Sequence, residues 1–563
     1  MFRPIAIASI VFATPSFADL TAEDVLAEHL NLLSGYGLIE VQTTGTTSRL
    51  DSVIVDGILG TYEDDETRVE ISTPGMTLSE KPDGSVQITY PDVIEVTVTA
   101  SPKNEETRSA TLALNTTGLE HIVSGTLENL THQIAFDTLS LGRITFDPPE
   151  TAEDLDLSAD FAIAGFDSTL TFDTRDITRR TVEIAFAGLT LAGTSLMPTN
   201  IELDTPGTTY DATGVGQSVF NIALSDVVSR IGFVGEDIPR HSMSTSFGQM
   251  NWQQNAELGG DEGAIDFSLN TTDFAVSYDL ALDLEGFGDA VDDDDSDAFE
   301  TALMDVLTDG QSASAALNFA SMSYDFGIET PEGTIASSTT SGTSENRFTM
   351  GEGGLAIFSE TLDSRAQFGG PAMGLPINTL GYSIARSMVD FAIPVIPSDV
   401  PQPFRLGFAF EGVSVEDVLW NIFDPEARLS RDPASLVLDI EGSIVATEPP
   451  FAEDTDVPFS EFDARLNTLT LEIAGASITG DGAAAGTATD DVPTGNAELN
   501  LVMTGINDLI DTAVEMGLLP NEQAMGARMG LSLIARPDGA DRLVSNITVD
   551  EKGRIFANGM QIK

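Results

Sequence analysis

The chain has 563 residues, of which 90 are Asp or Glu and 25 are Lys or Arg, so its formal net charge is −65. Nucleic acids and anionic membrane surfaces bind clustered Lys and Arg, so this composition excludes them as expected partners. The absence of Cys excludes disulfides, thiolate nucleophiles and thiolate metal ligands.

The first residues predict a secretory signal peptide. Arg3 precedes an apolar run from Ile5 to Ala13, and the small residues Ser16 and Ala18 stand where a signal peptidase reads the chain. We expect cleavage after Ala18 and export to a bacterial periplasm, with an ordinary N-terminal helix as the alternative. No later segment reaches the roughly 18 consecutive apolar residues that span a bilayer, so we expect no transmembrane segment after signal removal.

A short amphipathic helix is predicted next. Thr21 and Asp24 have a spacing that resembles a capping box, and Gly35 ends the pattern. One face of this helix carries three leucines: Leu26, Leu30 and Leu33.

After this helix the hydrophobic period changes to two. Segments such as "TRVEIS" (67–72) and "DVIEVTVTA" (92–100) alternate apolar and polar residues, and Pro82-Asp83-Gly84 supplies a hairpin turn. The same pattern returns along the whole chain. We therefore expect a mainly β protein with a few short helices, built from large curved antiparallel sheets whose edges or concave face the helices cover.

The later helical patterns are few. They lie at residues 217–233, 296–307 (capped by Ser296), 378–393, 414–425, 507–517 and from 521 onward (capped by Asn521). Joints rich in Pro, Ser or Thr suggest three regions after the signal at 1–18, namely an N-terminal β-rich region (19–200), a middle region (201–392) and a C-terminal region (393–563).

Motifs for catalysis or cofactor binding are missing. The four histidines are far apart in sequence and form no compact ligand pair: His29, His121, His132 and His241. The acidic run from Val291 to Asp297 lacks the glycine and the final glutamate of a calcium loop, and "GDGAAAG" (480–486) reads as a turn, since no lysine or helix follows it as in a phosphate loop. We expect no metal, no cofactor and no catalytic residue from motifs, although a Ser-His-Asp triad could assemble in space.

The segment "NEQAMGARMGLSLIARPDG" (521–539) is unusually rich in Met and Gly. On a helix, Met525 and Met529 share one face, with Gly526 and Gly530 beside them at the same spacing. Two readings stay open: the helix packs as a plug or end-cap on a sheet, or its methionines line a groove for an acyl chain or apolar peptide.

Three stretches resemble a known family. The signal followed by "GYG" (35–37), the stretch at 398–442 and above all the stretch at 516–563 look like exported alphaproteobacterial proteins grouped as domain of unknown function 2125. The resemblance covers essentially the whole mature chain. It implies export to the Gram-negative cell envelope and carries no activity, cofactor or catalytic residue.

We therefore hypothesise a non-enzymatic periplasmic protein that binds an apolar ligand or lipid in a groove lined by sheet. Our candidates for the lining residues are Trp420, Phe423, Met525 and Met529. One alternative is a structural or assembly-related envelope protein that acts through protein–protein contacts, for example strand addition at a sheet edge. A hydrolase with a dispersed site is the second alternative.

Overall fold

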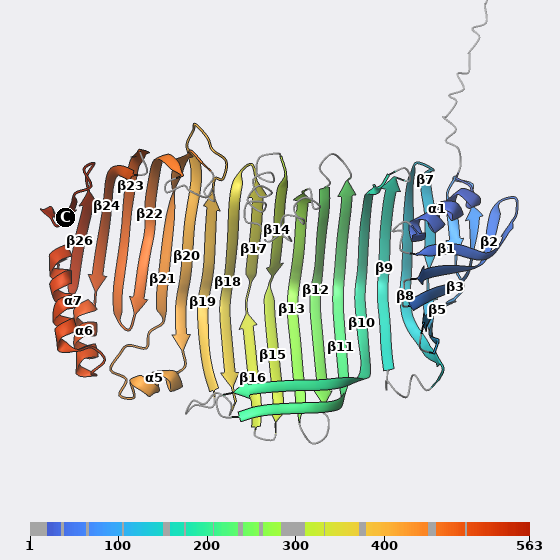
Figure 1. Cartoon of the computed structure of the whole chain (residues 1–563), viewed down its shortest axis with the longest axis horizontal. Coiled ribbons are helices and arrows are strands. Elements are labelled where there is room, and N and C mark those ends of the chain that lie inside the picture. Colours follow the sequence, from blue (N-terminus) through green and yellow to red (C-terminus); the bar gives the residue numbers. More distant parts are fainter. Residues whose placement is uncertain are drawn as a thin grey trace, which may run out of the picture. The chain divides into compact units, whose positions relative to one another are not determined.

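The computed structural model confirms a mainly β protein with a few short helices (Figure 1). It describes residues 20–34, 39–63, 67–103, 106–149, 158–173, 176–205, 208–234, 240–257, 263–282, 310–330, 333–370, 379–448, 458–489 and 492–563. The signal segment with Ala18, the acidic run at 291–297 and the expected helix at 296–307 lie outside these residues.

The chain divides into two compact units. Unit 1 comprises Met1–Thr190 with Ser229–Val234, and unit 2 comprises Leu191–Val228 with Gly235–Lys563. The three-region division at residues 200 and 392 stays a prediction.

Unit 1 has a conventional core in which one helix covers a sheet. The helix α1 (Ala22–Ser34) begins with the predicted cap, since the Thr21 hydroxyl accepts a hydrogen bond from the Asp24 amide at 3.1 Å. Leu26 is buried against the sheet, whereas Leu33 is 44% exposed, so the predicted leucine face is only partly buried. The buried side chains of α1 form one core with buried residues of the strands, namely Val53, Val55, Leu78, Val86, Ile88, Val123, Leu130 and Phe172.

In unit 1, two series of paired strands lie between β3 and β8. In one series β4 and β7 are the intervening strands, and in the other they are β5 and β6; every pairing is antiparallel. The expected turn at Pro82-Asp83-Gly84 joins β3 to β4, with Gly84 at φ 83°. The bounds are β1 (Glu40–Ser48), β2 (Ser52–Glu63), β3 (Thr67–Glu80), β4 (Val86–Thr89), β5 (Val93–Pro102), β6 (Arg108–Thr117), β7 (Glu120–Thr126), β8 (Asn129–Asp147), β9 (Ser158–Asp173) and β10 (Asp176–Thr205), of which β10 belongs to unit 1 only as far as Thr190.

Unit 2 is a long antiparallel sheet in which most strands pair with their neighbours in sequence. Near its middle, the short strands β14 and β15 each pair with a different part of the longer strand β13. In the same way, β16 and β17 each pair with a part of β18. The bounds are β11 (Thr208–Val234), β12 (Arg240–Glu257), β13 (Ala264–Ala281), β14 (Ser312–Phe319), β15 (Ser321–Thr330), β16 (Gly333–Ser341), β17 (Ser344–Gly351), β18 (Gly354–Gly369), β19 (Thr379–Ile393), β20 (Gln402–Val415), β21 (Ala434–Ala446), β22 (Phe459–Ile473), β23 (Ala476–Thr489), β24 (Val492–Thr504), β25 (Arg536–Pro537), β26 (Arg542–Val549), β27 (Ile555–Ala557) and β28 (Met560–Gln561).

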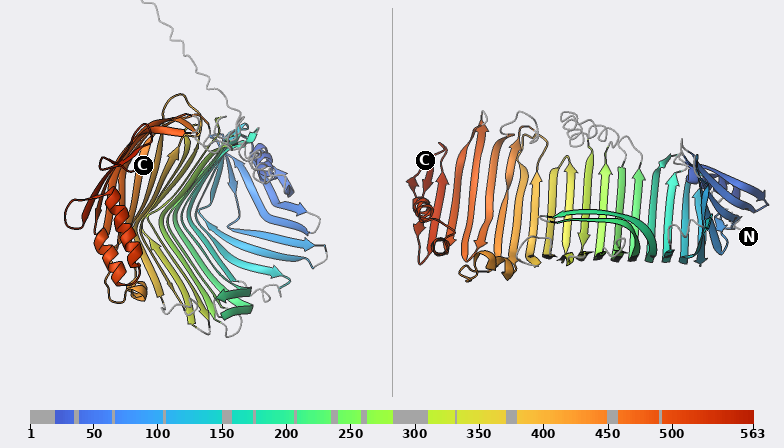
Figure 2. Two further views of the ribbon diagram at one scale, coloured as in Figure 1. Left: turned by 60° about the vertical axis from the view of Figure 1, so that its left-hand side comes forward. Right: turned by 60° about the horizontal axis from the view of Figure 1, so that its bottom comes forward.

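Long strands of unit 2 bend near mid-length, as Figure 2 shows. Residues with positive φ lie within these strands: Asp226 (52°), Asp273 (49°), Asp363 (51°) and Gly412 (66°). Apart from Gly, Asn and Asp are the residues most often found in this left-handed region, which turns the strand out of its extended course. The sequence places such a residue on β11, β13, β18 and β20, so the bend recurs across the sheet.

The helices in the C-terminal part of unit 2 (Figure 1) were each predicted. They are α5 (Asp417–Phe423), α6 (Ile506–Glu515) and α7 (Asn521–Ile534). The expected cap of α7 is wrong by one residue, because Pro520 holds the N-cap position and Asn521 is already helical. Asp541 caps α6 instead of a local side chain, and it accepts hydrogen bonds from the amides of Asn507 and Asp508, both at 3.1 Å.

Two predicted helices are strands. Residues 217–233 belong to β11, and residues 379–393 form β19, while residue 378 lies outside the described residues. The first prediction rested on Phe220, Ala223 and Val227, of which the last two are four apart, and the second rested on Leu380, Ile384 and Met388, which are all spaced by four. A spacing of four keeps side chains on one face of a strand as well as on one face of a helix, so it does not separate the two. The supposed turn at 480–486 also lies within a strand, β23.

Candidate functional site

An apolar row of side chains crosses unit 2 from strand to strand. Residues paired directly across antiparallel strands project on the same face of a sheet, so the register defines the row. This first row runs through Met243, Tyr278, Ala315, Phe348, Ile357, Phe391, Leu406, Ile440, Leu466, Gly482, Leu499 and Ile547. It crosses twelve strands, one residue on each: β12, β13, β14, β17, β18, β19, β20, β21, β22, β23, β24 and β26.

Two further rows lie on the same face, each two residues further along the strand, except on β22, where a register shift puts Leu469 three residues after Leu466. The second row runs through Thr245, Val276, Leu317, Asn346, Ser359, Val389, Phe408, Leu438, Leu469, Gly480, Leu501 and Ser545. The third row runs through Phe410, Leu436, Leu471, Ile478, Met503 and Leu543. We call the surface formed by these three rows the apolar face.

Many side chains of the apolar face are open to solvent. Seven large ones are between 37% and 40% exposed: Leu317, Ile357, Val389, Leu406, Phe410, Leu436 and Leu471. Single exposed apolar residues are common on proteins, but a contiguous set marks a binding surface or an aggregation hazard.

The opposite face of the same strands carries the charges. Arg386 lies between Glu360 and Glu411, with nitrogen–oxygen distances of 2.7 Å to each. Arg405 pairs with Asp390 at 3.0 Å on the same face. Further pairs join Arg347 to Glu345 and Arg240 to Asp279. The sheet of unit 2 is thus amphipathic, with a charged face and an apolar face.

The apolar sheet surfaces of the two units are covered to different extents. In unit 1, α1 covers the sheet and fourteen apolar residues form one buried cluster. Among the described residues of unit 2, the buried cluster holds only Leu282 and Ala313. The apolar face of unit 2 therefore has much less internal cover than the sheet of unit 1. Part of it is covered at β24 and β26, where Met503 and Ser545 are each 3% exposed and the Ser545 hydroxyl donates to the Ile534 carbonyl of α7 at 2.6 Å.

The residues expected to line a groove lie on helices, not in the rows of the apolar face. Trp420 and Phe423 contact each other on α5, with ring centroids 5.2 Å apart. Met525 and Met529 lie one turn apart on α7 and are 66% and 71% exposed. These two methionines are therefore not packed against the sheet, whereas the reading of the helix as a plug or end-cap and the role of the methionines in ligand binding both stay predictions.

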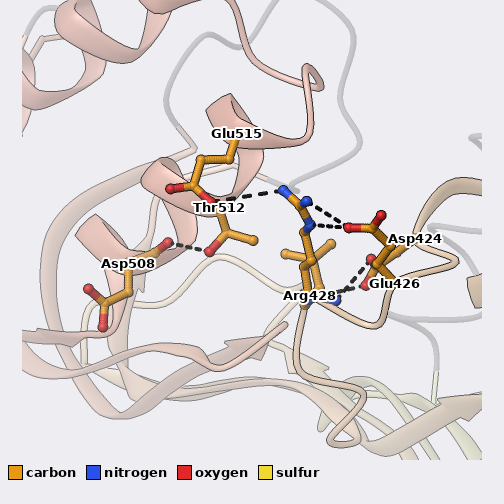
Figure 3. A network of polar contacts seen from close by, with 7 residues as sticks. Asp424, Glu426, Arg428, Asp508, Thr512 and Glu515 are labelled. Carbon is orange, nitrogen blue, oxygen red and sulfur yellow. Dashed lines mark hydrogen bonds and ion pairs between the residues drawn. The ribbon is translucent and has the colours of Figure 1, made fainter.

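Polar contacts link the segment after α5 with α6 (Figure 3). Arg428 pairs with Glu426 at 2.6 Å and reaches Glu515 of α6 at 3.9 Å. The carboxylate of Asp424 accepts the amides of Arg428 and Leu429, both at 2.9 Å. Arg528 of α7 in turn pairs with Asp511 of α6. The three helices are thus joined through charged groups, while their exposed apolar side chains stay free of these contacts.

Three of the four histidines meet in unit 1, a grouping that the sequence separation concealed. The Nδ1 atom of His121 lies 2.9 Å from the Tyr90 hydroxyl, and its Nε2 atom lies 3.0 Å from Nδ1 of His132. His29 of α1 packs on both rings, with centroids 6.2 and 6.3 Å away. His121 and His132 are each 2% exposed.

Burial keeps this histidine cluster neutral. It lowers the pKa of His121 to about 3 and that of His132 to about 4, and the neighbouring histidines add to the effect. Burial also lowers the pKa of His29 and raises the pKa of Tyr90 to about 12. The Nδ1 atom of His29 and the Nε2 atom of His132 are buried without a hydrogen-bond partner. These groups form a desolvated core that holds α1 on the sheet.

The histidine cluster does not have the composition of a hydrolytic triad. Both hydrogen bonds of His121 go to Tyr90 and His132, and neither goes to a Ser or an Asp. Within the described ranges, no three His, Asp or Glu side chains are placed to hold a metal ion.

A hollow of about 920 Å³ opens on the charged face of unit 2. Its lining includes Phe404, Arg405, Glu441 and Arg465. Arg405, Glu441 and Arg465 face one another across β20, β21 and β22, so each cation has an anion beside it. These opposite charges neutralise one another, so the hollow has no preference for an anionic or a cationic ligand.

Comparisons with known proteins give no relative. No family model, no curated protein and no solved structure matches the chain. Membership of the family named domain of unknown function 2125 therefore stays a prediction. None of the helices in the described part of the chain has the length and apolarity to cross a bilayer.

Proposed function

We propose that the protein is a non-enzymatic binding protein of the bacterial cell envelope that holds an apolar ligand, most simply the acyl chains of a lipid, on the apolar face of unit 2. The observation that carries the proposal is the first row, which continues across twelve strands without a charged residue. The periplasmic location within this proposal rests on the signal pattern before Ala18.

The physical gain from ligand binding is large enough to matter. Removing apolar surface from water contributes about 25 cal/mol per Å², or about 0.8 kcal/mol for each methylene buried. Leu406 and Leu436 are both 40% exposed, so each still has apolar area that a ligand can cover. Acyl chains need no hydrogen bonds, and the rows offer few.

The first experiment is native mass spectrometry with organic extraction, applied to the mature protein purified from its own periplasm. A co-purifying lipid or acyl species supports the proposal. A protein that carries no lipid and that binds neither added lipid nor an apolar dye contradicts it.

A matched pair of variants tests where the ligand lies. Leu436→Asp places a charge on the apolar face at an exposed position, and a bound acyl chain would have to bury that charge. Thr470→Asp, on the neighbouring strand β22, places the same charge on the opposite face. We expect binding of an apolar dye to weaken by about tenfold or more in the first variant and to stay unchanged in the second. Equal effects in both would contradict this location.

The exposed side chains of α7 favour a protein–protein role as a second candidate function. Met525 and Met529 together present a flexible apolar surface of the kind that adapts to partners. Strand addition has less support at the C-terminal edge, where β25 and β27 already pair with the outer side of β26. Cross-linking from positions on α7 in periplasmic extract tests this candidate, and recovery of no partner speaks against it.

A further inference from the structure

We infer that the apolar face holds several acyl-chain lipids side by side in one continuous track, and not a single ligand in a closed pocket. The inference rests on the proposed function and concerns the number and class of the ligands. It follows from the length of the first row, from its unbroken apolar character and from the way it narrows midway.

The track is far longer than one acyl chain. Twelve strands have eleven gaps of about 4.8 Å, so the first row is about 53 Å long. The hydrocarbon core of a bilayer holds two opposed layers of chains in about 30 Å, so one chain extends about 15 Å. A single chain lying along the first row therefore covers less than a third of it.

The track narrows at β17 and β18 without being interrupted. There the second row turns polar, with Asn346 opposite Ser359, and the Ser359 hydroxyl donates to the Asn346 side chain at 2.7 Å. Beyond it, Ser344 and Thr361 share a hydrogen bond of 3.0 Å. The first row stays apolar across these strands through Phe348 and Ile357, which we call the neck. Two wider apolar areas, one on each side, meet at the neck.

The surface fits lipid chains better than a folded protein or a second copy of this chain. None of the residues in the three rows is charged, although 20% of the whole chain is. A protein interface instead combines pockets for anchor residues with about one hydrogen bond per 100–200 Å². The rows repeat much the same aliphatic and aromatic surface from strand to strand, and two chains with a net charge of −65 each repel one another.

Native mass spectrometry of the purified full-length mature protein tests the number of ligands after incubation with vesicles of dioleoylphosphatidylcholine. We expect a series of species with at least three bound lipids per chain. Saturation at one lipid overturns the inference but leaves the proposed function standing. Binding of no lipid overturns both.

Substitutions at and near the neck test whether the track is continuous. Ile357→Asp introduces a charge at a position that is 40% exposed, so the folded sheet tolerates it. Thr349→Asp, on β17, is the matched control because its exposed side chain projects from the opposite face. Circular dichroism verifies that both variants keep the β-sheet content of the parent chain.

We expect Ile357→Asp to lower the largest number of bound lipids by at least one and to weaken the affinity for the first lipid without abolishing it, because the rows on either side of the neck are unchanged. Thr349→Asp should leave both quantities unchanged. An unchanged lipid number in Ile357→Asp would show that lipids do not lie across the neck. Loss of all binding in that variant would show one indivisible site. Either result overturns the inference of a continuous track.

Discussion

The neutral histidine cluster of unit 1 predicts a steep loss of stability in mild acid. An unfolded histidine has a pKa of 6.5, whereas the pKa values of His121 and His132 in the fold are about 3 and about 4. The unfolded state therefore binds more protons below pH 6.5. Stability from these groups is complete above pH 6.5 and is lost as the pH falls toward the folded pKa values.

The magnitude follows from linkage. At pH 5 each unfolded histidine is almost fully protonated, and each folded one remains mostly neutral. The difference contributes about 2 kcal/mol per group, so His121 and His132 together cost about 4 kcal/mol between pH 8 and pH 5. Since each 1.4 kcal/mol is a factor of ten, the opening equilibrium of unit 1 should rise about 10³-fold.

Amide hydrogen exchange measures this opening locally, in peptides from α1 and from β7 and β8, after correction for the intrinsic pH dependence of exchange. The double variant His121→Phe, His132→Phe keeps aromatic rings and removes both titrating groups. The loss of protection of about 10³-fold that we expect in the parent chain between pH 8 and pH 5 should therefore be absent from this variant. His241→Ala lies outside the cluster and is the control. The same fall in the parent and in the double variant would refute the reasoning.

Three further predictions concern caps and ion pairs. Asp541→Ala removes the cap of α6 and should cost the α6–α7 pair about 1 kcal/mol, seen as faster hydrogen exchange in α6; a normal exchange rate would show that the cap is dispensable. The amides that bind Asp541 outweigh its burial and hold its pKa below the usual value, so this contribution should disappear only in strong acid. Thr21→Ala removes the α1 cap and should cost about 1 kcal/mol in urea unfolding of unit 1, without changing α6 exchange. Arg528→Ala breaks an exposed ion pair with Asp511 and should change α7 stability by less than about 1 kcal/mol; a larger loss would mean that the pair does more than its exposure suggests.

The sequence predicts helices best where a capping or terminating signal accompanies the apolar spacing. Thr21 with Asp24 marked α1, and Pro425 and Gly517 ended the patterns of α5 and α6. The segments at 217–233 and 378–393 were predicted from apolar spacing alone, and the structure has strands there. Apolar spacing alone leaves the element type open, because four residues is a whole number of strand periods.

The candidate site needed information that a linear sequence does not contain. Leu406 and Ile357 are separated by about fifty residues, and only the strand register places them in one row. The histidine cluster had a weaker but readable signal. His121 and His132 are nearly symmetric about the turn of one hairpin, and His121 faces Ile134, two residues from His132. A hairpin model of 120–135 would have placed these rings on the same face.

The order of strands in unit 2 affects how the sheet can become longer or shorter in evolution. From β18 to β24 each strand contacts chiefly its immediate neighbours in sequence, so stability is a sum of local terms, as in repeat proteins. Gain or loss of one hairpin, such as β21 with β22, would alter the span of the sheet by about 10 Å and leave distant strands undisturbed. Sheet length in such a protein is therefore a quantity that selection adjusts in steps, hairpin by hairpin, without redesigning a core.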